Sequence, residues 1–148
     1  MKTYFERQII WEVVVLFVGF IIWMTLAYLF QWGDNPLTLG GYGFVLLSMI
    51  LPLVFFYKMD IEMDEAAIQV SFGTALFKKK IALAEVYSVS IVKPKWYHGT
   101  GIRFQSHGML YRARFTDAVE LKLKGSDRTI QIGSKDVEGL RQAIEARL

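Results

Sequence analysis

The clearest pattern in the chain is a pair of long uncharged segments near its start. Residues 13–30 contain no charged side chain, and residues 37–57 form a second uncharged run. A helix needs about 20 residues to cross the roughly 30 Å hydrocarbon core of a bilayer. The two runs therefore predict membrane-spanning helices over residues 9–30 and 39–57, joined into a hairpin by the turn-forming connection between them.

The second apolar segment contains residues that weaken a helix. Pro52 interrupts it and glycines lie near its start, so a re-entrant or interfacial segment is the alternative to a full span. Small side chains also permit close approach between helices in a membrane. The candidate residues for a helix–helix interface are Gly40, Gly41, Gly43 and Ser48.

The distribution of lysine and arginine predicts the orientation of the hairpin. Lys2 and Arg7 precede the first helix and Lys58 follows the second, whereas the connection between the helices has no basic residue and one acidic residue, Asp34. Cytoplasmic flanks of membrane helices are enriched in lysine and arginine. We therefore expect a multi-pass protein of the cell inner (plasma) membrane with both termini in the cytoplasm.

After residue 57 the chain changes to the pattern of a small soluble domain. Short segments alternate apolar and polar residues with the period of half-buried strands. Val137, Leu140, Ile144 and Leu148 then fall on one face of a helix. This order predicts an α+β domain in which about seven strands form a twisted barrel or half-barrel, closed at one end by the C-terminal helix. The short segments from which these strands are expected cover residues 59–63, 68–72, 76–81, 86–92, 102–104, 109–111, 118–123 and 128–132.

Several segments of this domain together suggest a family. They are KKKIALAEVYSVSIV (residues 78–92), GTGIRF (99–104), GMLYRARF (108–115), AVELKLKGSDRTIQIGSKDVEGL (118–140) and the final helix. In these segments the chain resembles the PH-like domains of small bacterial membrane proteins, which commonly follow two helices. The resemblance implies a membrane hairpin over residues 1–57, then a cytoplasmic PH-like barrel over residues 58–148 that has seven strands, a helix cap and no catalytic residue.

The same resemblance says little about activity, because most members of the family have no known function. Eukaryotic PH domains hold phosphoinositide phosphates with a basic loop between the first two strands. Here that position is the acidic turn at Asp64 and Glu65. The resemblance therefore does not imply phosphoinositide recognition.

Positive charge is concentrated in the middle of the chain. Residues 78–114 carry eight basic side chains and one acidic side chain, although the net charge of the whole chain is only +3. A basic surface on a tethered domain indicates attraction to anionic headgroups, about 1 kcal/mol per Lys or Arg near the membrane. A solvated face that aids solubility is the alternative. The candidate residues for binding lipid or a partner are Lys78, Lys79, Lys80, Lys93, Lys95 and Arg103. For Arg103, a structural salt bridge to Glu120 is a second interpretation.

The residue types that catalysis and metal binding require are scarce. The chain has no cysteine, which excludes disulfides, thiolate metal ligands and cysteine nucleophiles. Its two histidines, His98 and His107, lie in turns next to glycine without metal-ligand spacing. No GxSxG, Walker or HExxH motif is present. We therefore expect no enzyme, no cofactor, no metal site and no nucleic-acid partner.

Two functions remain open at this stage. The first is a non-enzymatic adaptor or binding module at the cytoplasmic face of the inner membrane, which binds a protein partner or anionic lipid. The second is a small auxiliary subunit of a membrane transporter or enzyme complex, or a homo-oligomer, assembled through the transmembrane hairpin.

Overall fold

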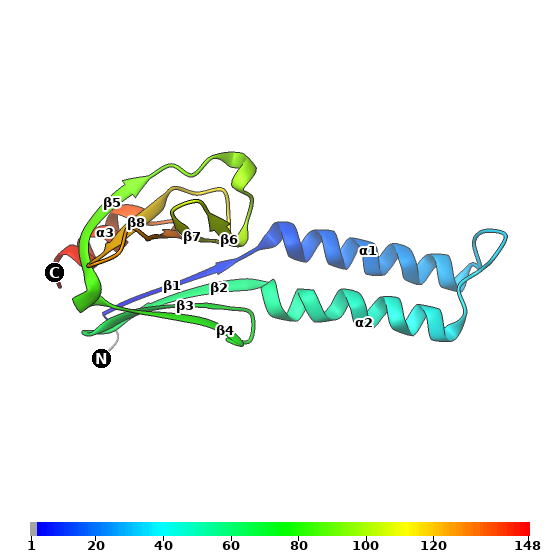
Figure 1. Ribbon diagram of the computed structural model, residues 1–148. Helices are drawn as coiled ribbons and strands as arrows, with labels where there is room; N and C mark the ends of the chain where they lie inside the picture. The colour runs from blue at the N-terminus through cyan, green and yellow to red at the C-terminus, as the bar shows by residue number, and fades with distance from the viewer. Residues whose placement is uncertain (1–2) are drawn as a thin grey trace.

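The computed structural model describes residues 3–148, so Lys2, used above for the orientation, lies outside the described residues. Two apolar helices, α1 (Trp11–Leu29) and α2 (Leu39–Phe56), are each long and apolar enough to cross a membrane. Figure 1 shows them side by side, projecting from one end of a β domain. None of their residues is buried within the chain, as expected for helices that expose apolar surface to lipid.

The two helices form a hairpin with few polar contacts. The Thr25 and Tyr42 hydroxyls lie 2.9 Å apart across the pair, and the ring of Tyr42 stacks on that of Tyr28 with centroids 4.5 Å apart. α2 runs as one helix through Pro52. Both helices begin and end within two residues of the expected bounds.

The β domain contains two sheets. The first consists of four antiparallel strands in chain order: β1 (Tyr4–Ile9), β2 (Lys58–Met63), β3 (Ala67–Phe72) and β4 (Phe77–Ala82). The second has the order β5-β8-β9-β7-β6, with β7 and β9 parallel. Its strands are β5 (Val86–Val92), β6 (Gly101–Gln105), β7 (Gly108–Arg112), β8 (Ala118–Leu123) and β9 (Thr129–Gly133). Two 3-10 helices, η1 (Leu83–Glu85) and η2 (Trp96–His98), flank β5, and the chain ends with α3 (Val137–Glu145).

The predicted α+β class is confirmed, and every strand expected after residue 57 is present. Within residues 3–148 the strands form two separate sheets and no closed barrel. Together the sheets act as two layers that share one hydrophobic core.

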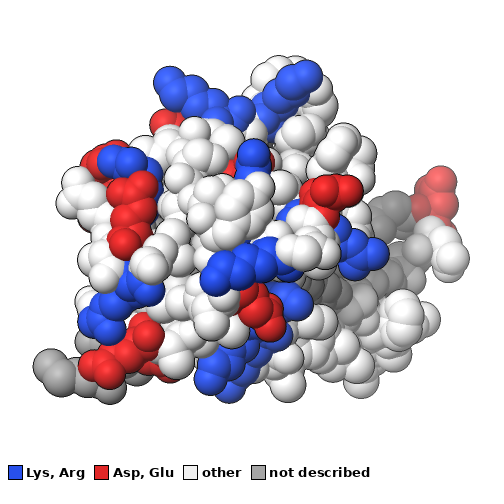
Figure 2. Space-filling model, turned by 60° about the vertical axis from the view of Figure 1, so that its left-hand side comes forward, with Lys and Arg blue, Asp and Glu red and all other residues white. Residues whose placement is uncertain are grey.

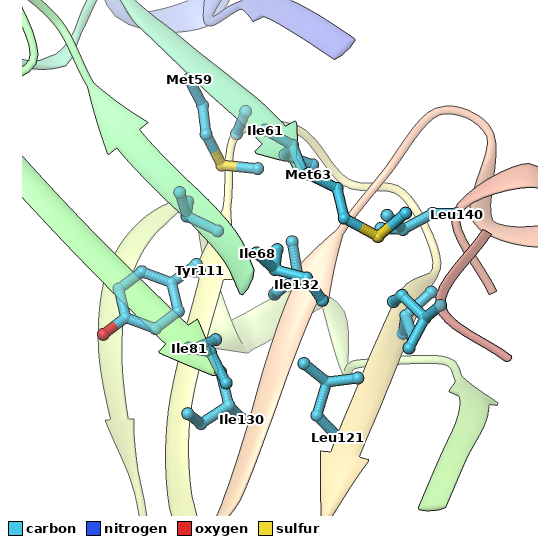
Figure 3. Packing of buried hydrophobic residues seen from close by; sticks show 14 of the residues in the cluster. Met59, Ile61, Met63, Ile68, Ile81, Tyr111, Leu121, Ile130, Ile132 and Leu140 are labelled. Carbon is cyan, nitrogen blue, oxygen red and sulfur yellow. The ribbon is translucent and has the colours of Figure 1, made fainter. Parts of the chain in front are cut away.

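The core lies between the two sheets and is closed at one end by α3. Figure 3 shows Ile68 of the first sheet near Ile132 of the second, with Leu140 of α3 beside Met63. These side chains are fully buried. Each buried side chain of this size stabilises the fold by about 1.5–3 kcal/mol relative to exposure. The helix is fixed at its start because the Asp136 carboxylate accepts a hydrogen bond from the Gly139 amide.

The first strand, β1, was not expected from the sequence. It pairs with β2 along its whole length, from Tyr4 opposite Met63 to Ile9 opposite Lys58. Ile10 alone separates β1 from α1, and Tyr57 alone separates α2 from β2. The transmembrane hairpin is thus inserted at the tip of a β-hairpin, and residues 4–9 belong to the β domain.

Side chains of β1 also fix the strand to the second sheet. The Glu6 carboxylate accepts hydrogen bonds from the Ser134 hydroxyl and the Lys135 amide. The buried Gln8 amide donates to the carbonyl oxygen of Gly133 at 3.0 Å. These contacts join the start of the chain to the segment between β9 and α3. These contacts hold the start of α1 next to the hydrophobic core.

Candidate functional site

Three connections lie at the end of the β domain from which the helices project. They are the turn of residues 73–76 between β3 and β4, the segment of residues 93–100 between β5 and β6, and residues 113–117 between β7 and β8. The β3–β4 turn lies next to Lys58, because Phe72 before the turn pairs with Met59. The other two connections lie together at one end of the second sheet, where Val92 pairs with Ala118 and Gly101 pairs with Arg112. Thr100 and Gly101 line one hollow together with Ile10 and Val13 at the base of α1. Figure 1 shows the β3–β4 turn beside the base of α2 and the segment before β6 beside the base of α1.

The β3–β4 turn packs directly on the last turn of α2. The Gly73 amide donates to the carbonyl oxygen of Lys58 at 2.8 Å, and Gly73 has a φ of +58°. A β-carbon at Gly73 would lie 2.3 Å from the carbonyl oxygen of Phe55, which is closer than atoms can approach. The ring of Phe77, which follows the turn, stacks on Phe56 with centroids 5.5 Å apart. Glycine is therefore required where this turn contacts the helix.

Large apolar side chains are exposed on all three connections. Trp96 is 79% exposed, Leu76 66% and Phe115 57%. Tryptophan and tyrosine favour the level of lipid headgroups, whereas exposed apolar groups in water normally indicate an interaction surface. We call this set the apolar rim; its members are Leu76, Phe77, Trp96, Tyr97 and Phe115. Sequence reasoning missed the rim, because only the fold brings the three connections to one end.

Basic residues lie among these apolar groups. Lys93 and Lys95 follow β5 directly and lead into η2, and the Lys95 ammonium lies 5.5 Å from the centre of the Tyr97 ring. Arg114 lies in the third connection, next to Phe115. The opposite end of the domain, turned forward in Figure 2, shows Lys and Arg intermixed with Asp and Glu. Three of the six residues predicted from sequence therefore border the rim: Lys93, Lys95 and Lys78, which follows Phe77.

The lysine run lies on β4, a free edge of the first sheet. Lys78 follows Phe77 at the membrane end, whereas Lys80 pairs with Gln69 farther along the strand. The pairing of Lys79 with buried Val70 puts both on the core-facing side of the sheet. Lysines on an edge strand also prevent it from pairing with another chain. Among the three lysines, Lys78 therefore contributes most to the basic surface at the membrane end.

Arg103 lies apart from the lysines, on β6. Its Nε donates to the carbonyl oxygen of Thr100 at 3.3 Å, which bends the side chain toward the helices. The alternative salt bridge to Glu120 is wrong, because Glu120 instead accepts a hydrogen bond from Gln131 at 2.9 Å. Arg103 has no acidic partner in the part of the chain that the structure describes.

Two hollows meet at Arg103. The first, about 270 Å³, is lined by residues from the bases of both helices and from the start of β6: Ile10, Val13, Phe17, Pro52, Phe56, Thr100, Gly101, Ile102 and Arg103. The second, about 440 Å³, is lined by Tyr97, His98, Arg103, Phe104, Gln105 and Ser106. We call them the junction groove and the polar hollow. The junction groove is mostly apolar, with Thr100 and Arg103 as its polar members, and the polar hollow contains several hydrogen-bonding side chains.

A charged cluster joins β1 to β2 just above the helices. The Asp60 carboxylate lies 2.8 Å from Arg7 Nε and 3.1 Å from Lys58 Nζ. Burial alone would raise the pKa of this carboxyl, but hydrogen bonds from Arg7 and Lys58 outweigh that effect and lower the pKa overall. Asp60 therefore stays ionised and fixes two basic side chains at the membrane end.

The small residues predicted to form a helix–helix interface do not hold α1 against α2. A β-carbon added at Gly40 or Gly43 would meet no atom within 4 Å, and one at Gly41 would meet only Thr38 and Leu37. The Ser48 hydroxyl donates to the carbonyl oxygen of Val45 within its own helix. This part of α2 is therefore open on the outside of the hairpin.

Comparison with known proteins gives no family for the chain. No protein-family model matches it, and no curated protein matches it. The PH-like resemblance remains a prediction from the segments quoted above. The rim, the basic residues and the two hollows are the features of the molecule that bear on its function.

Proposed function

We propose that this protein is a non-enzymatic, membrane-anchored binding module at the cytoplasmic face of a bacterial inner membrane, and that its β domain binds anionic lipid headgroups. The observation that carries the proposal is the junction between strands and helices. One residue on each side, Ile10 and Tyr57, separates the paired strands from the membrane-crossing helices. With so short a connection the domain stays at the bilayer surface, with the apolar rim turned toward the headgroups.

The chemistry of the rim supports lipid as the ligand. Trp96 and Tyr97 combine an apolar ring with a polar edge, which suits the headgroup level, and Lys93 and Lys95 precede them. Each lysine near an anionic surface contributes about 1 kcal/mol. A protein partner is the other ligand to consider for such a surface, but it would have to fit between the domain and the bilayer.

The proposed orientation agrees with the charge pattern. Arg7, Lys58 and the basic connections all lie on the domain side of the helices, and Asp34 lies in the connection at their far end. Basic flanks favour the cytoplasmic side. The PH-like assignment belongs to the same proposal and is supported by the succession of mostly antiparallel strands followed by one C-terminal helix. A closed barrel is not part of that support.

Hydrogen exchange in lipid nanodiscs tests the proposal. We expect the amides of residues 73–76, 93–100 and 113–117 to exchange more slowly in discs that contain phosphatidylglycerol than in discs of phosphatidylcholine. The paired variant Lys93→Gln/Lys95→Gln should reduce this difference for residues 93–100. Lys124→Gln, in the turn at the opposite end of the domain, is the matched control and should leave it unchanged. Equal exchange of the wild type in both kinds of disc would contradict the proposal.

A second candidate function is supported by the open face of α2. A β-carbon added at Gly40 or Gly43 would meet no atom within 4 Å, which leaves room for a helix of another membrane protein. In that case the protein is an auxiliary subunit assembled through its hairpin. Gly43→Leu should then release the partner while the β domain stays folded. Gly19→Leu on α1, where an added β-carbon also meets no atom within 4 Å, is the matched control. Retained assembly in Gly43→Leu would count against this function.

A further inference from the structure

The junction groove is positioned so that lipid is its natural occupant. Val13 and Phe17 in the first two turns of α1 and Pro52 and Phe56 in the last two turns of α2 form its apolar walls. Surfaces of this kind are surrounded by acyl chains. At about 270 Å³ the groove is slightly smaller than sites that enclose drug-sized ligands, which is suited to a segment of a chain.

The border of the groove on the side of the β domain is cationic and polar. Arg103 lines both the groove and the polar hollow, and its Nε makes one long hydrogen bond, to the Thr100 carbonyl. A guanidinium group binds phosphate with several donors at once, whereas one carbonyl uses only one of them. Beyond Arg103, the polar hollow offers His98, Gln105 and Ser106. Along one path the site is therefore apolar, then cationic, then hydrogen-bonding.

We infer that this path is a binding site for one anionic phospholipid of the surrounding bilayer. An acyl chain lies in the junction groove, the phosphate is held by Arg103, and a hydroxylated headgroup such as glycerol enters the polar hollow. The inference rests on the proposed lipid-binding function but concerns Arg103 and the two hollows, which share only Tyr97 with the rim. The rim predicts general attraction of the domain to an anionic membrane surface, whereas this site predicts that the protein retains one lipid molecule.

Native mass spectrometry of the full-length protein in mild detergent tests this site. Phosphatidylglycerol, phosphatidylcholine and soluble glycerol phosphate are added separately. We expect one phosphatidylglycerol to remain bound, phosphatidylcholine to bind at least about tenfold more weakly, and glycerol phosphate not to bind, because it lacks the chain. Equal retention of the two lipids, or binding of glycerol phosphate alone, would overturn the inference.

Variants of Arg103 separate charge from folding. Arg103→Gln should weaken retention of phosphatidylglycerol by at least about tenfold, since hydrogen bonds to a charged group are lost. Arg103→Lys should restore part of it, and Lys124→Gln should match the wild type. Because Arg103 is exposed, its replacement should leave the unfolding temperature unchanged.

The two proposals can fail separately. Retention of phosphatidylglycerol by Arg103→Gln at the wild-type level, together with slower exchange of the rim in anionic discs, would overturn the single-lipid site and leave the proposed function standing. Loss of retention in Arg103→Gln without any difference in exchange at the rim would support the site and contradict the role of the rim.

Discussion

The insertion of the membrane hairpin between two paired strands makes a sharp prediction about folding. A protein of residues 58–148 contains every strand expected for the soluble domain but lacks β1 and Ile10. We predict that it does not fold. The matched protein lacks the membrane helices instead. Its residues 11–56 are replaced by the dipeptide Asn-Gly, which connects Ile10 to Tyr57.

The size of the effect follows from the contacts of β1. Ile10 is 1% exposed, so its burial contributes about 1.5–3 kcal/mol. The hydrogen bonds of the Glu6 carboxylate with Ser134 and Lys135 contribute about 1.5–3 kcal/mol each where a charge is involved. These contacts alone approach the total stability of a typical domain, about 5–15 kcal/mol. The truncated protein also loses every hydrogen bond between β1 and β2, which increases the total loss of stability.

The Asn-Gly protein should fold because its new turn fits the ladder. The Ile10 amide donates to the carbonyl oxygen of Tyr57 at 2.9 Å, and a two-residue Asn-Gly turn closes a hydrogen-bonded pair of this kind. Circular dichroism with thermal unfolding is the assay. We expect a cooperative transition for the Asn-Gly protein and none for residues 58–148. A cooperative transition at the same temperature in both would refute the argument that β1 is part of the domain.

Two further predictions concern the membrane end of the domain. Gly73→Ala should lower the unfolding temperature of the full-length protein by more than Gly125→Ala: both glycines have positive φ, which costs about 1–2 kcal/mol for alanine, but only Gly73 also abuts backbone of α2. Equal shifts would contradict the close packing on α2. Asp60→Asn should lower the unfolding temperature of the Asn-Gly protein at pH 7, and the loss should shrink as the pH falls below about 4, the ordinary pKa of Asp. The folded-state pKa of Asp60 is lowered, so its stabilising effect is present above that pH and disappears as the carboxyl becomes protonated. A loss that is the same at every pH would contradict the role of the Asp60 charge.

The sequence was sufficient to predict the elements that have regular patterns. Two long uncharged runs became α1 and α2, and alternating segments became the strands after residue 57. β1 was missed for a physical reason. Its inward-facing side chains include Glu6 and Gln8, which are polar and form hydrogen bonds with residues 133–135, more than 120 positions away. No local pattern of apolar residues marks such a strand.

The candidate site was predictable only in part. Lys93 and Lys95 were selected on charge, and the fold places them at the membrane end, next to the exposed Trp96. Leu76 and Phe115 were not selected, because a single apolar residue in a turn is an ordinary feature of a sequence. Their proximity to the helices depends on the long-range pairing of β1 with β2 and on the return of β8 beside β5.

Mass spectrometry of everything that copurifies with the full-length protein in mild detergent tests the central claim most directly. The account predicts anionic phospholipid enriched above its share of the source membrane, without a stoichiometric protein partner. A lipid composition equal to that of the membrane, together with one stoichiometric membrane protein, would contradict lipid binding and favour the subunit assembled through α2.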